Sequence, residues 1–274
     1  MAKRILVAVI FVPLLFCVIM FLPNFWWALV VAFISGMAAF ELLRATGEGK
    51  ITIPMRVMSL LSAIVIPLGS WFGWAIPVSG VSVFLVMAVS FWCAIRAYNE
   101  GDVSIGFYHV MLTLFAGGVI PLGLSTLVHL SGMEHGRFLV LFAVLLNFIT
   151  DGAAYFGGIF LGKHRGITQV SPKKSLEGYI SGFVGGAVFA VIYGLIIGAI
   201  EGVAVNLLPF ALCGLLGALF TELGDLVFSF IKRQYGVKDY GKLLPGHGGM
   251  LDRFDSMILC APVVFFIVYY LPVF

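Results

Sequence analysis

The chain has 274 residues, of which 61% are hydrophobic and only 11% are charged, with a formal net charge of +3. A soluble domain needs about a quarter of its residues charged to cover a water-facing surface, so this composition excludes a soluble globule. The apolar residues form continuous runs of about 18 to 25, whereas the strands of a membrane β-barrel alternate apolar and polar residues. The sequence therefore predicts an all-α integral membrane protein.

Nine apolar runs are expected to cross the membrane as a polytopic helical bundle. The first resembles a signal peptide, but it is too long for one and a second run follows almost at once, so we expect an uncleaved helix. Pro67 and Pro77 interrupt the third and fourth runs, where a kinked or re-entrant element is the alternative. The nine spans cover about 5–22, 25–43, 57–76, 78–95, 106–129, 137–161, 178–200, 205–230 and 254–273.

The basic residues predict how this bundle is oriented. If the N-terminus is cytoplasmic and the C-terminus outside, only Arg137 of the 16 lysines and arginines lies outside, as the positive-inside rule favours. We expect a multi-pass protein of the inner (cytoplasmic) membrane. Four cysteines lie far apart within apolar runs, so neither a disulfide nor a zinc site is expected; they are Cys17, Cys93, Cys213 and Cys260.

The loops suggest that the two ends of the chain have different roles. The outward connections are short, whereas the inward loops 162–177 and 231–253 are longer, basic and rich in glycine and proline. We therefore expect N-terminal transmembrane helices at 1–76, middle helices at 77–136, and a catalytic region at 137–274 that faces the cytoplasm.

Polar residues follow one face of two of the later spans. Asn147, Asp151 and Tyr155 recur every four residues and so share a helix face. A carboxylate within a membrane costs about 2.5 to 3.5 kcal/mol, so Asp151 must face a partner or a wet cavity; a functional role is favoured over a structural ion pair. The 205–230 span and its end carry a second polar stripe, in which the two bases could instead be snorkelling anchors: Thr221, Glu222, Asp225, Ser229, Lys232 and Arg233.

The segment after this stripe is rich in glycine and ends in two acids. Gly248 and Gly249 let backbone N–H groups approach an anion, at the start of a helix whose dipole favours negative charge. Asp252 and Asp255 are three residues apart and project from one helix face, where a divalent cation would relieve their repulsion; magnesium is the natural candidate. Simple capping of the helix dipole is the alternative. His247 could act as a general base or only as a hydrogen-bonding group.

The other inward loop displays a hydroxyl and two lysines at a predicted helix start. Ser171 and Pro172 form a helix-start pattern, so Lys173 and Lys174 would lie at an anion site. The two lysines could instead contact anionic lipid headgroups. Acids that hold a cation and bases that hold phosphates, level with the headgroups, indicate phosphoryl or nucleotidyl transfer at the membrane surface.

The run from Ser229 to Asp255 resembles the signature of the CDP-diacylglycerol synthases, also called phosphatidate cytidylyltransferases. The loop from Ser171 to Gly178 and the helix that carries Asp151 are similar to that family's as well. Every specified position of the signature is met: Ser229, Ile231, Lys232, Arg233, Lys238, Asp239, Gly241, Leu244, Pro245, His247, Gly248, Gly249, Met250, Asp252, Arg253, Phe254 and Asp255.

The resemblance implies a magnesium-dependent membrane enzyme that makes CDP-diacylglycerol and pyrophosphate from CTP and phosphatidic acid. It also implies a homodimer in the bilayer with no nucleic-acid partner, and leaves open whether a monovalent cation joins magnesium. The metal ligands would be Asp225, Asp252 and Asp255, with Asp239 and His247 orienting groups. Substrate-binding candidates are Ser171, Lys173, Lys174, Ser229, Gly248 and Gly249; the bases Lys232, Arg233, Lys238 and Arg253 would act on phosphates, and Asn147, Asp151 and Glu222 would support the site.

Two rival functions fit parts of the same pattern. Membrane-embedded acids with glycine-rich breaks also occur in cation- or proton-coupled transporters, although the polar residues here gather at one face instead of the midplane. A CTP-dependent lipid kinase would use similar residues, but it would release CDP where nucleotidyl transfer releases pyrophosphate.

Overall fold

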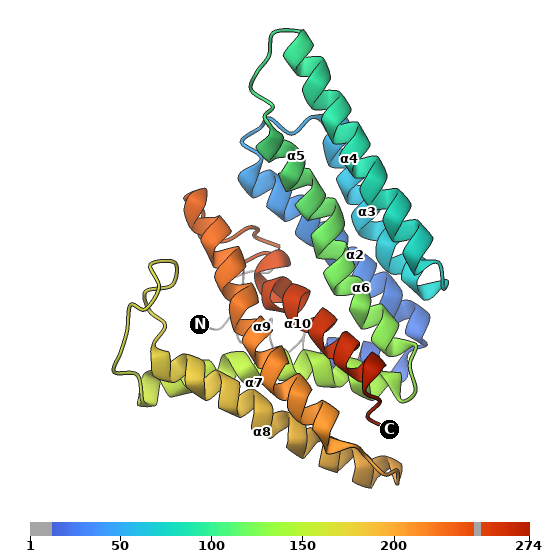
Figure 1. Ribbon diagram of the computed structural model, residues 1–274, viewed down its shortest axis with the longest axis vertical. Helices are drawn as coiled ribbons and strands as arrows, with labels where there is room; N and C mark the ends of the chain where they lie inside the picture. The colour runs from blue at the N-terminus through green and yellow to red at the C-terminus, as the bar shows by residue number, and fades with distance from the viewer. Residues whose placement is uncertain (1–12, 244–247) are drawn as a thin grey trace. The chain divides into compact units, whose positions relative to one another are not determined.

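The computed structural model describes residues 13–243 and 248–274, and its regular structure in these ranges is helical. Residues 13–21 form a first helical stretch. The helices that follow are shown in Figure 1: α2 (Asn24–Thr46), α3 (Ile53–Trp71), α4 (Ala75–Asn99), α5 (Phe107–Leu114), a π-helical turn η1 (Phe115–Val119), α6 (Ile120–Ser131), α7 (Gly136–Phe160), α8 (Leu176–Glu201), α9 (Leu207–Gln234) and α10 (Leu251–Tyr270).

Each predicted span from 25–43 onward coincides with helical structure to within a few residues. In the described part of the chain, seven helices are long and apolar enough to cross a membrane, with Phe107–Ser131 counted as one. The first predicted span lies partly outside the described residues, and the ninth corresponds to α10, which is not among the seven. The protein is thus a polytopic helical membrane protein, while nine crossings and their orientation stay predictions.

The uncertain region 57–95 forms two separate helices. Pro67 lies inside α3, and α3 and α4 are joined by a short turn in which Gly73 adopts φ +75°. Only glycine takes this backbone conformation without strain, so the turn ends α3 and lets α4 start anew.

The helices fall into two compact units along the chain. Unit 1 comprises Met1–Gly132 and Tyr235–Phe254, and unit 2 comprises Met133–Gln234 and Asp255–Phe274. These two units differ from the expected parts 1–76, 77–136 and 137–274. The reason is that the segment before α10 belongs to the same unit as the N-terminal helices. The three-part division of function stays a prediction.

In unit 1, α2 packs against α3 and α6, and α3 also packs against α4 and η1. The approach of α3 to η1 is close: a Cβ at Gly117 would lie 2.9 Å from the Cα of Ser59. The hydroxyl of Ser62 donates to the carbonyl of Gly117 at 2.5 Å, and that of Ser59 to the carbonyl of Thr113 at 3.1 Å. Small side chains and interhelical hydrogen bonds therefore hold these helices together, as is usual in membranes.

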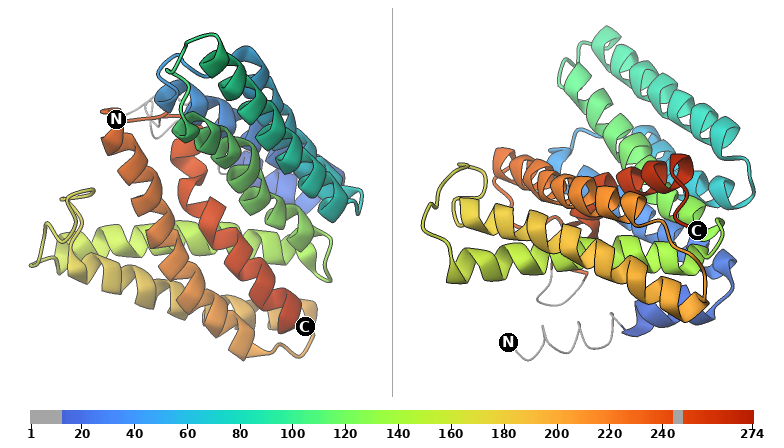
Figure 2. Two further views of the ribbon diagram at one scale, coloured as in Figure 1. Left: turned by 45° about the horizontal axis from the view of Figure 1, so that its top comes forward. Right: turned by 60° about the horizontal axis from the view of Figure 1, so that its bottom comes forward.

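In unit 2, α7 and α8 lie alongside each other, as both views of Figure 2 show, and α9 packs against both. A Cβ at Gly182 would lie 3.0 Å from the Cβ of Ala154, and one at Gly186 would lie 2.8 Å from the Cβ of Ala218. These two glycines therefore serve packing within the chain. Where α9 passes α10, a Cβ at Gly224 would lie 2.8 Å from the Cα of Ser256, so the two backbones are in direct contact.

Candidate functional site

The densest polar contact in unit 2 is a cluster of one lysine and two acids, which we call the lysine–carboxylate cluster: Lys174, Glu222 and Asp225. The ammonium of Lys174, just before α8, lies 2.6 Å from Oε2 of Glu222 and 2.8 Å from Oδ2 of Asp225. Glu222 and Asp225 are three residues apart on α9 and therefore share a helix face. One base from the loop before α8 thus joins two acids of the predicted stripe.

The two carboxylates of this cluster stabilise the protonated form of Lys174. Burial alone would lower the pKa of the Lys174 ammonium, but the negative charges of Asp225 and Glu222 outweigh burial and raise the pKa above its ordinary value. The ring of Tyr179 lies below the same ammonium, with its centroid 5.1 Å away. The other carboxylate oxygen of Glu222, Oε1, is buried and has no hydrogen-bond partner in the described part of the chain. This oxygen can therefore accept a hydrogen bond or bind a cation.

Helix α7 supplies two of the three predicted supporting residues, Asn147 and Asp151. The hydroxyl of Thr221 donates to the side-chain oxygen of Asn147 at 3.2 Å, which ties α9 to α7 in the core. One turn further along α7, Asp151 interacts electrostatically with Lys174, Asp225, Glu222 and Asp255. Asp151 therefore lies within electrostatic range of charged groups, while its supporting role stays a prediction.

Two further predicted residues meet where α9 approaches α10 within unit 2. The ammonium of Lys232 lies 3.9 Å from Oδ2 of Asp255, and both side chains are largely buried. The other oxygen of Asp255 accepts the backbone N–H of Ser256 at 2.8 Å. The close approach of Gly224 to this part of α10 places the neighbouring Asp225 beside it along α9.

In unit 1, a second polar arrangement surrounds Asp252. Its Oδ2 accepts the backbone N–H groups of Tyr240 and Gly249, both at 2.9 Å. Gly248 adopts φ +84°, a conformation that favours glycine, and this turn brings the Gly249 N–H round to the carboxylate. The side chain of Glu41 on α2 accepts the backbone N–H of Leu251 at 2.8 Å. The backbone at Tyr240, Gly249 and Leu251 thus lies against carboxylates.

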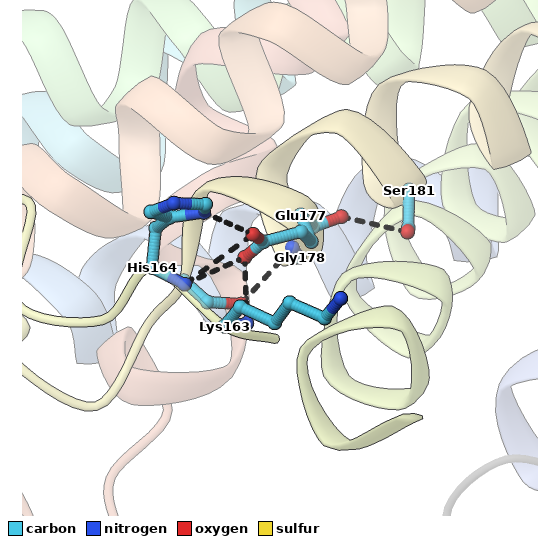
Figure 3. Close-up of polar contacts among 6 residues, drawn as sticks. Lys163, His164, Glu177, Gly178 and Ser181 are labelled. Atoms are coloured by element: carbon cyan, nitrogen blue, oxygen red, sulfur yellow. Dashed lines mark hydrogen bonds and ion pairs between the residues drawn. The ribbon is translucent and has the colours of Figure 1, made fainter. Parts of the chain in front are cut away.

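The loop before α8 contacts the first turn of that helix, as Figure 3 shows. A carboxylate oxygen of Glu177 accepts the backbone N–H of Lys163 at 3.1 Å, and both of its oxygens accept that of His164, at 3.2 and 3.3 Å. The imidazole Nδ1 of His164 lies 2.5 Å from the same carboxylate. The hydroxyl of Ser175 caps α8 by accepting the N–H of Gly178 at 3.1 Å. The loop that displays Lys173 and Lys174 is therefore anchored at its base.

The predicted site residues differ in how accessible they are in this structure. The exposed ones are Asp151, Lys173, Arg233, Lys238, Asp239 and Arg253; the partly buried ones are Ser171, Lys174, Asp225, Lys232 and Gly248; the buried ones are Asn147, Glu222, Ser229, Gly249, Asp252 and Asp255. His247 lies outside the described residues. The exposed bases are free to reach a phosphate, except that Arg233 Nε also donates to the carbonyl of Val170 at 3.4 Å.

The predicted magnesium ligands are divided between the two units. Asp225 and Asp255 belong to unit 2 and Asp252 to unit 1. Within the described ranges, no three histidine, cysteine, aspartate or glutamate side chains gather closely enough to hold a metal ion. Carboxylates are nevertheless the donors that magnesium prefers, and Asp225 and Asp255 come from helices that touch, so the residues fit the ion chemically. The assignment of these three ligands stays a prediction.

Two acids with clear structural roles were missed by the sequence reasoning. Glu41 lies in the second span, where the membrane cost that drew attention to Asp151 applies equally. The free-energy cost of a carboxylate within an apolar span could therefore have identified Glu41 from the sequence. Glu177 was recognised only as part of a loop pattern, and its contacts with Lys163 and His164 depend on how the loop folds back.

These features define a polytopic helical membrane protein in which, within unit 2, acids of α7, α9 and α10 interact with Lys174 and Lys232. A family model described as the cytidylyltransferase family matches residues 2–271. The chain belongs to this family.

Several curated proteins are similar to this chain over most of its length. YnbB of Escherichia coli, an uncharacterised protein, is 33% identical over 261 residues, which cover 89% of this chain and 85% of that protein. The phosphatidate cytidylyltransferase of Staphylococcus haemolyticus is 31% identical over 269 residues, 96% of this chain and 97% of that protein. The phosphatidate cytidylyltransferase of Mycobacterium bovis is 31% identical over 268 residues, 94% and 85% respectively.

Proposed function

We propose that this protein is a phosphatidate cytidylyltransferase, which converts CTP and phosphatidic acid into CDP-diacylglycerol and pyrophosphate. The observation that carries the proposal is the family match over nearly the whole chain, together with relatives of that name at 31% identity. We place the enzyme in the inner membrane with its site facing the cytoplasm, as the distribution of basic residues favours. The family resemblance also supports a homodimer.

In the proposed reaction, a phosphate oxygen of phosphatidic acid attacks the α-phosphorus of CTP. A new P–O bond forms there as the bond from the α-phosphorus to the bridging oxygen breaks, and pyrophosphate leaves with the bond's electron pair. A phosphate monoester is already anionic at neutral pH, so no strong general base is needed. Asp239 and His247 then orient groups instead of removing a proton.

The bases of the site neutralise the charge that moves to the pyrophosphate. The candidates are Lys232, Arg233, Lys238 and Arg253, three of which are exposed. Of the two loop lysines, Lys174 is already engaged by Glu222 and Asp225, whereas Lys173 is exposed. We therefore assign phosphate contact to Lys173 and give Lys174 the role of arranging the two carboxylates.

Magnesium, held by Asp225, Asp252 and Asp255, would supply electrostatic stabilisation of the leaving pyrophosphate. The unpartnered oxygen of Glu222 beside Asp225 supports a cation in this region. Asp151 and Asn147 would keep the α7 face of the site polar. Adding monovalent cations to the magnesium-dependent assay tests whether one of them also binds.

The purified protein in detergent tests the proposal with labelled CTP and phosphatidic acid. We expect labelled CDP-diacylglycerol and stoichiometric pyrophosphate, and loss of both when magnesium is chelated. Release of CDP would instead identify a lipid kinase, and substrate uptake into sealed vesicles without turnover would identify a transporter. Light scattering of the same preparation tests the homodimer.

Single charge-removing variants test the residue roles. Asp225→Asn and Asp252→Asn should lower turnover by at least about 100-fold, which exceeds the usual loss from an outer-sphere change. Asp102→Asn is the matched control, because Asp102 is exposed and its side chain accepts a local N–H, that of Ser104 at 2.8 Å. Near-normal turnover in either site variant would contradict the roles assigned here.

A further inference from the structure

Glu41 is a buried acid on α2, far from the predicted catalytic region in sequence. Only 2% of the residue is exposed. Its Oε2 accepts the backbone N–H of Leu251, the first residue of α10, at 2.8 Å and across 210 residues of chain. The first N–H groups of a helix have no partner within the helix, and a negative charge there is favoured by the helix dipole. Glu41 therefore caps α10 from another helix.

Gly241 and Gly249 are packed directly onto this carboxylate. A Cβ added at Gly241 or at Gly249 would collide with the carboxylate of Glu41. Only glycine at both positions lets the backbone come this close. One turn along α2, Arg44 Nη2 donates to the carbonyl of Tyr240 at 3.3 Å. Helix α2 thus holds the segment at two places that share one helix face.

The same segment fixes the carboxylate of Asp252. Its Oδ2 accepts the N–H groups of Tyr240 and Gly249, each of which is adjacent to a point where α2 holds the backbone. Asp252 is also the next residue after Leu251, whose N–H Glu41 receives. The position of the Asp252 side chain therefore depends on the contact between α2 and the start of α10.

We propose that Glu41 is a positioning residue for the transfer reaction: by capping α10 and supporting Gly241 and Gly249, it holds Asp252 in its working orientation. This inference rests on the proposed function, in which Asp252 takes part in catalysis. Glu41 itself is enclosed by backbone and does not contact substrate. In this proposal, helix α2 of the N-terminal part helps to position a catalytic side chain.

Hydrogen exchange measured by mass spectrometry tests the contact without reference to activity. Glu41→Leu keeps the approximate size but removes the acceptor, so the amides of Gly249 and Leu251 should exchange about 10- to 100-fold faster. Glu41→Gln keeps one acceptor oxygen without the charge, and a smaller increase of about 3- to 10-fold is expected. Leu42→Ala is the control on the same helix, since it removes buried packing but no polar contact with this segment.

Steady-state kinetics test the positioning role. We expect kcat to fall by about 10- to 100-fold in Glu41→Leu and less in Glu41→Gln, with KM for CTP within about twofold of the wild type. Leu42→Ala should lower thermal stability while its exchange at Gly249 and Leu251 stays as in the wild type. Partial recovery of both kcat and amide protection in Glu41→Gln, relative to Glu41→Leu, would separate positioning from a general loss of folding.

The inference is overturned if Glu41→Leu exchanges like the wild type at Gly249 and Leu251, or if it keeps a normal kcat. Should Glu41→Leu not fold, Glu41→Gln decides alone: unchanged exchange at these amides, or an unchanged kcat, overturns the proposal. If the wild type makes no CDP-diacylglycerol, the proposed function fails, whereas the exchange result still reports on the contact with α10.

Discussion

Replacing Lys174 by methionine tests how much the lysine–carboxylate cluster stabilises unit 2. The side chains of Lys174, Glu222 and Asp225 are 28%, 7% and 29% exposed. Breaking a fully buried ion pair by removing one partner costs about 3 to 5 kcal/mol, whereas an exposed pair contributes about 0 to 1 kcal/mol. This cluster lies between the two cases, so we expect the variant to lose about 2 kcal/mol of unfolding free energy. For a chain of this size, the unfolding temperature should fall by about 4 to 8 °C.

Thermal unfolding in detergent, followed by tryptophan fluorescence, measures this loss. Lys173→Met is the matched control for stability, because it removes the same charge from the neighbouring exposed position and should change stability by less than about 0.5 kcal/mol. Adding Glu222→Gln to Lys174→Met removes one unpaired carboxylate and should restore about 1 kcal/mol. If Lys174→Met is as stable as Lys173→Met, the cluster does not stabilise the fold and the reasoning fails.

The pH dependence of the same difference follows from the raised pKa of Lys174. A cation whose pKa is raised on folding contributes fully below its unfolded pKa, about 10.4 for lysine, and loses the contribution only as pH rises through the higher folded pKa. The stability difference between the wild type and Lys174→Met should therefore stay constant between about pH 7 and pH 9. A difference that shrinks across this range would show that Lys174 loses its proton there.

Two other variants test the contacts that shape unit 2. Glu177→Ala removes the acceptor for the N–H groups of Lys163 and His164, so trypsin should cleave the loop after Lys163 or Arg165 about 10-fold faster, and an unchanged rate would contradict the anchoring. Gly224→Val places a side chain against the backbone of α10, where neither backbone can yield, and should lower the unfolding free energy by about 1 to 3 kcal/mol in the same fluorescence assay; wild-type stability would contradict the close approach.

The helices were predictable because the apolar runs that define them are continuous. The runs at 137–161 and 178–200, for example, correspond to α7 (Gly136–Phe160) and α8 (Leu176–Glu201), whose bounds differ from the predicted ones by one or two residues. The polar stripe of α9 was also predictable, since Glu222 and Asp225 share a face by helix geometry alone. These are local properties, fixed by residue spacing within one element.

The interaction partners of the charged residues were harder to predict from the sequence. Lys174, a predicted phosphate ligand, also joins Glu222 across 48 residues, a contact that only the packing of α8 on α9 creates. Glu41 meets Leu251 across 210 residues. The sequence contained a signal for Glu41, namely an acid within an apolar span, but no feature of local spacing identifies the backbone N–H that it accepts.

The balance of charge in unit 2 bears on how a nucleotide could enter. Asp151 interacts electrostatically with three other acids, Glu222, Asp225 and Asp255, and Lys174 and Lys232 lie beside members of this group. Counted formally, four negative and two positive groups leave −2, so a triphosphate alone would be repelled at this place. We propose that a divalent cation accompanies the nucleotide and offsets this excess of carboxylates. Exposed bases such as Lys173 would then contact the phosphates. The acids and bases of the site are thus suited to a nucleotide that arrives together with its cation.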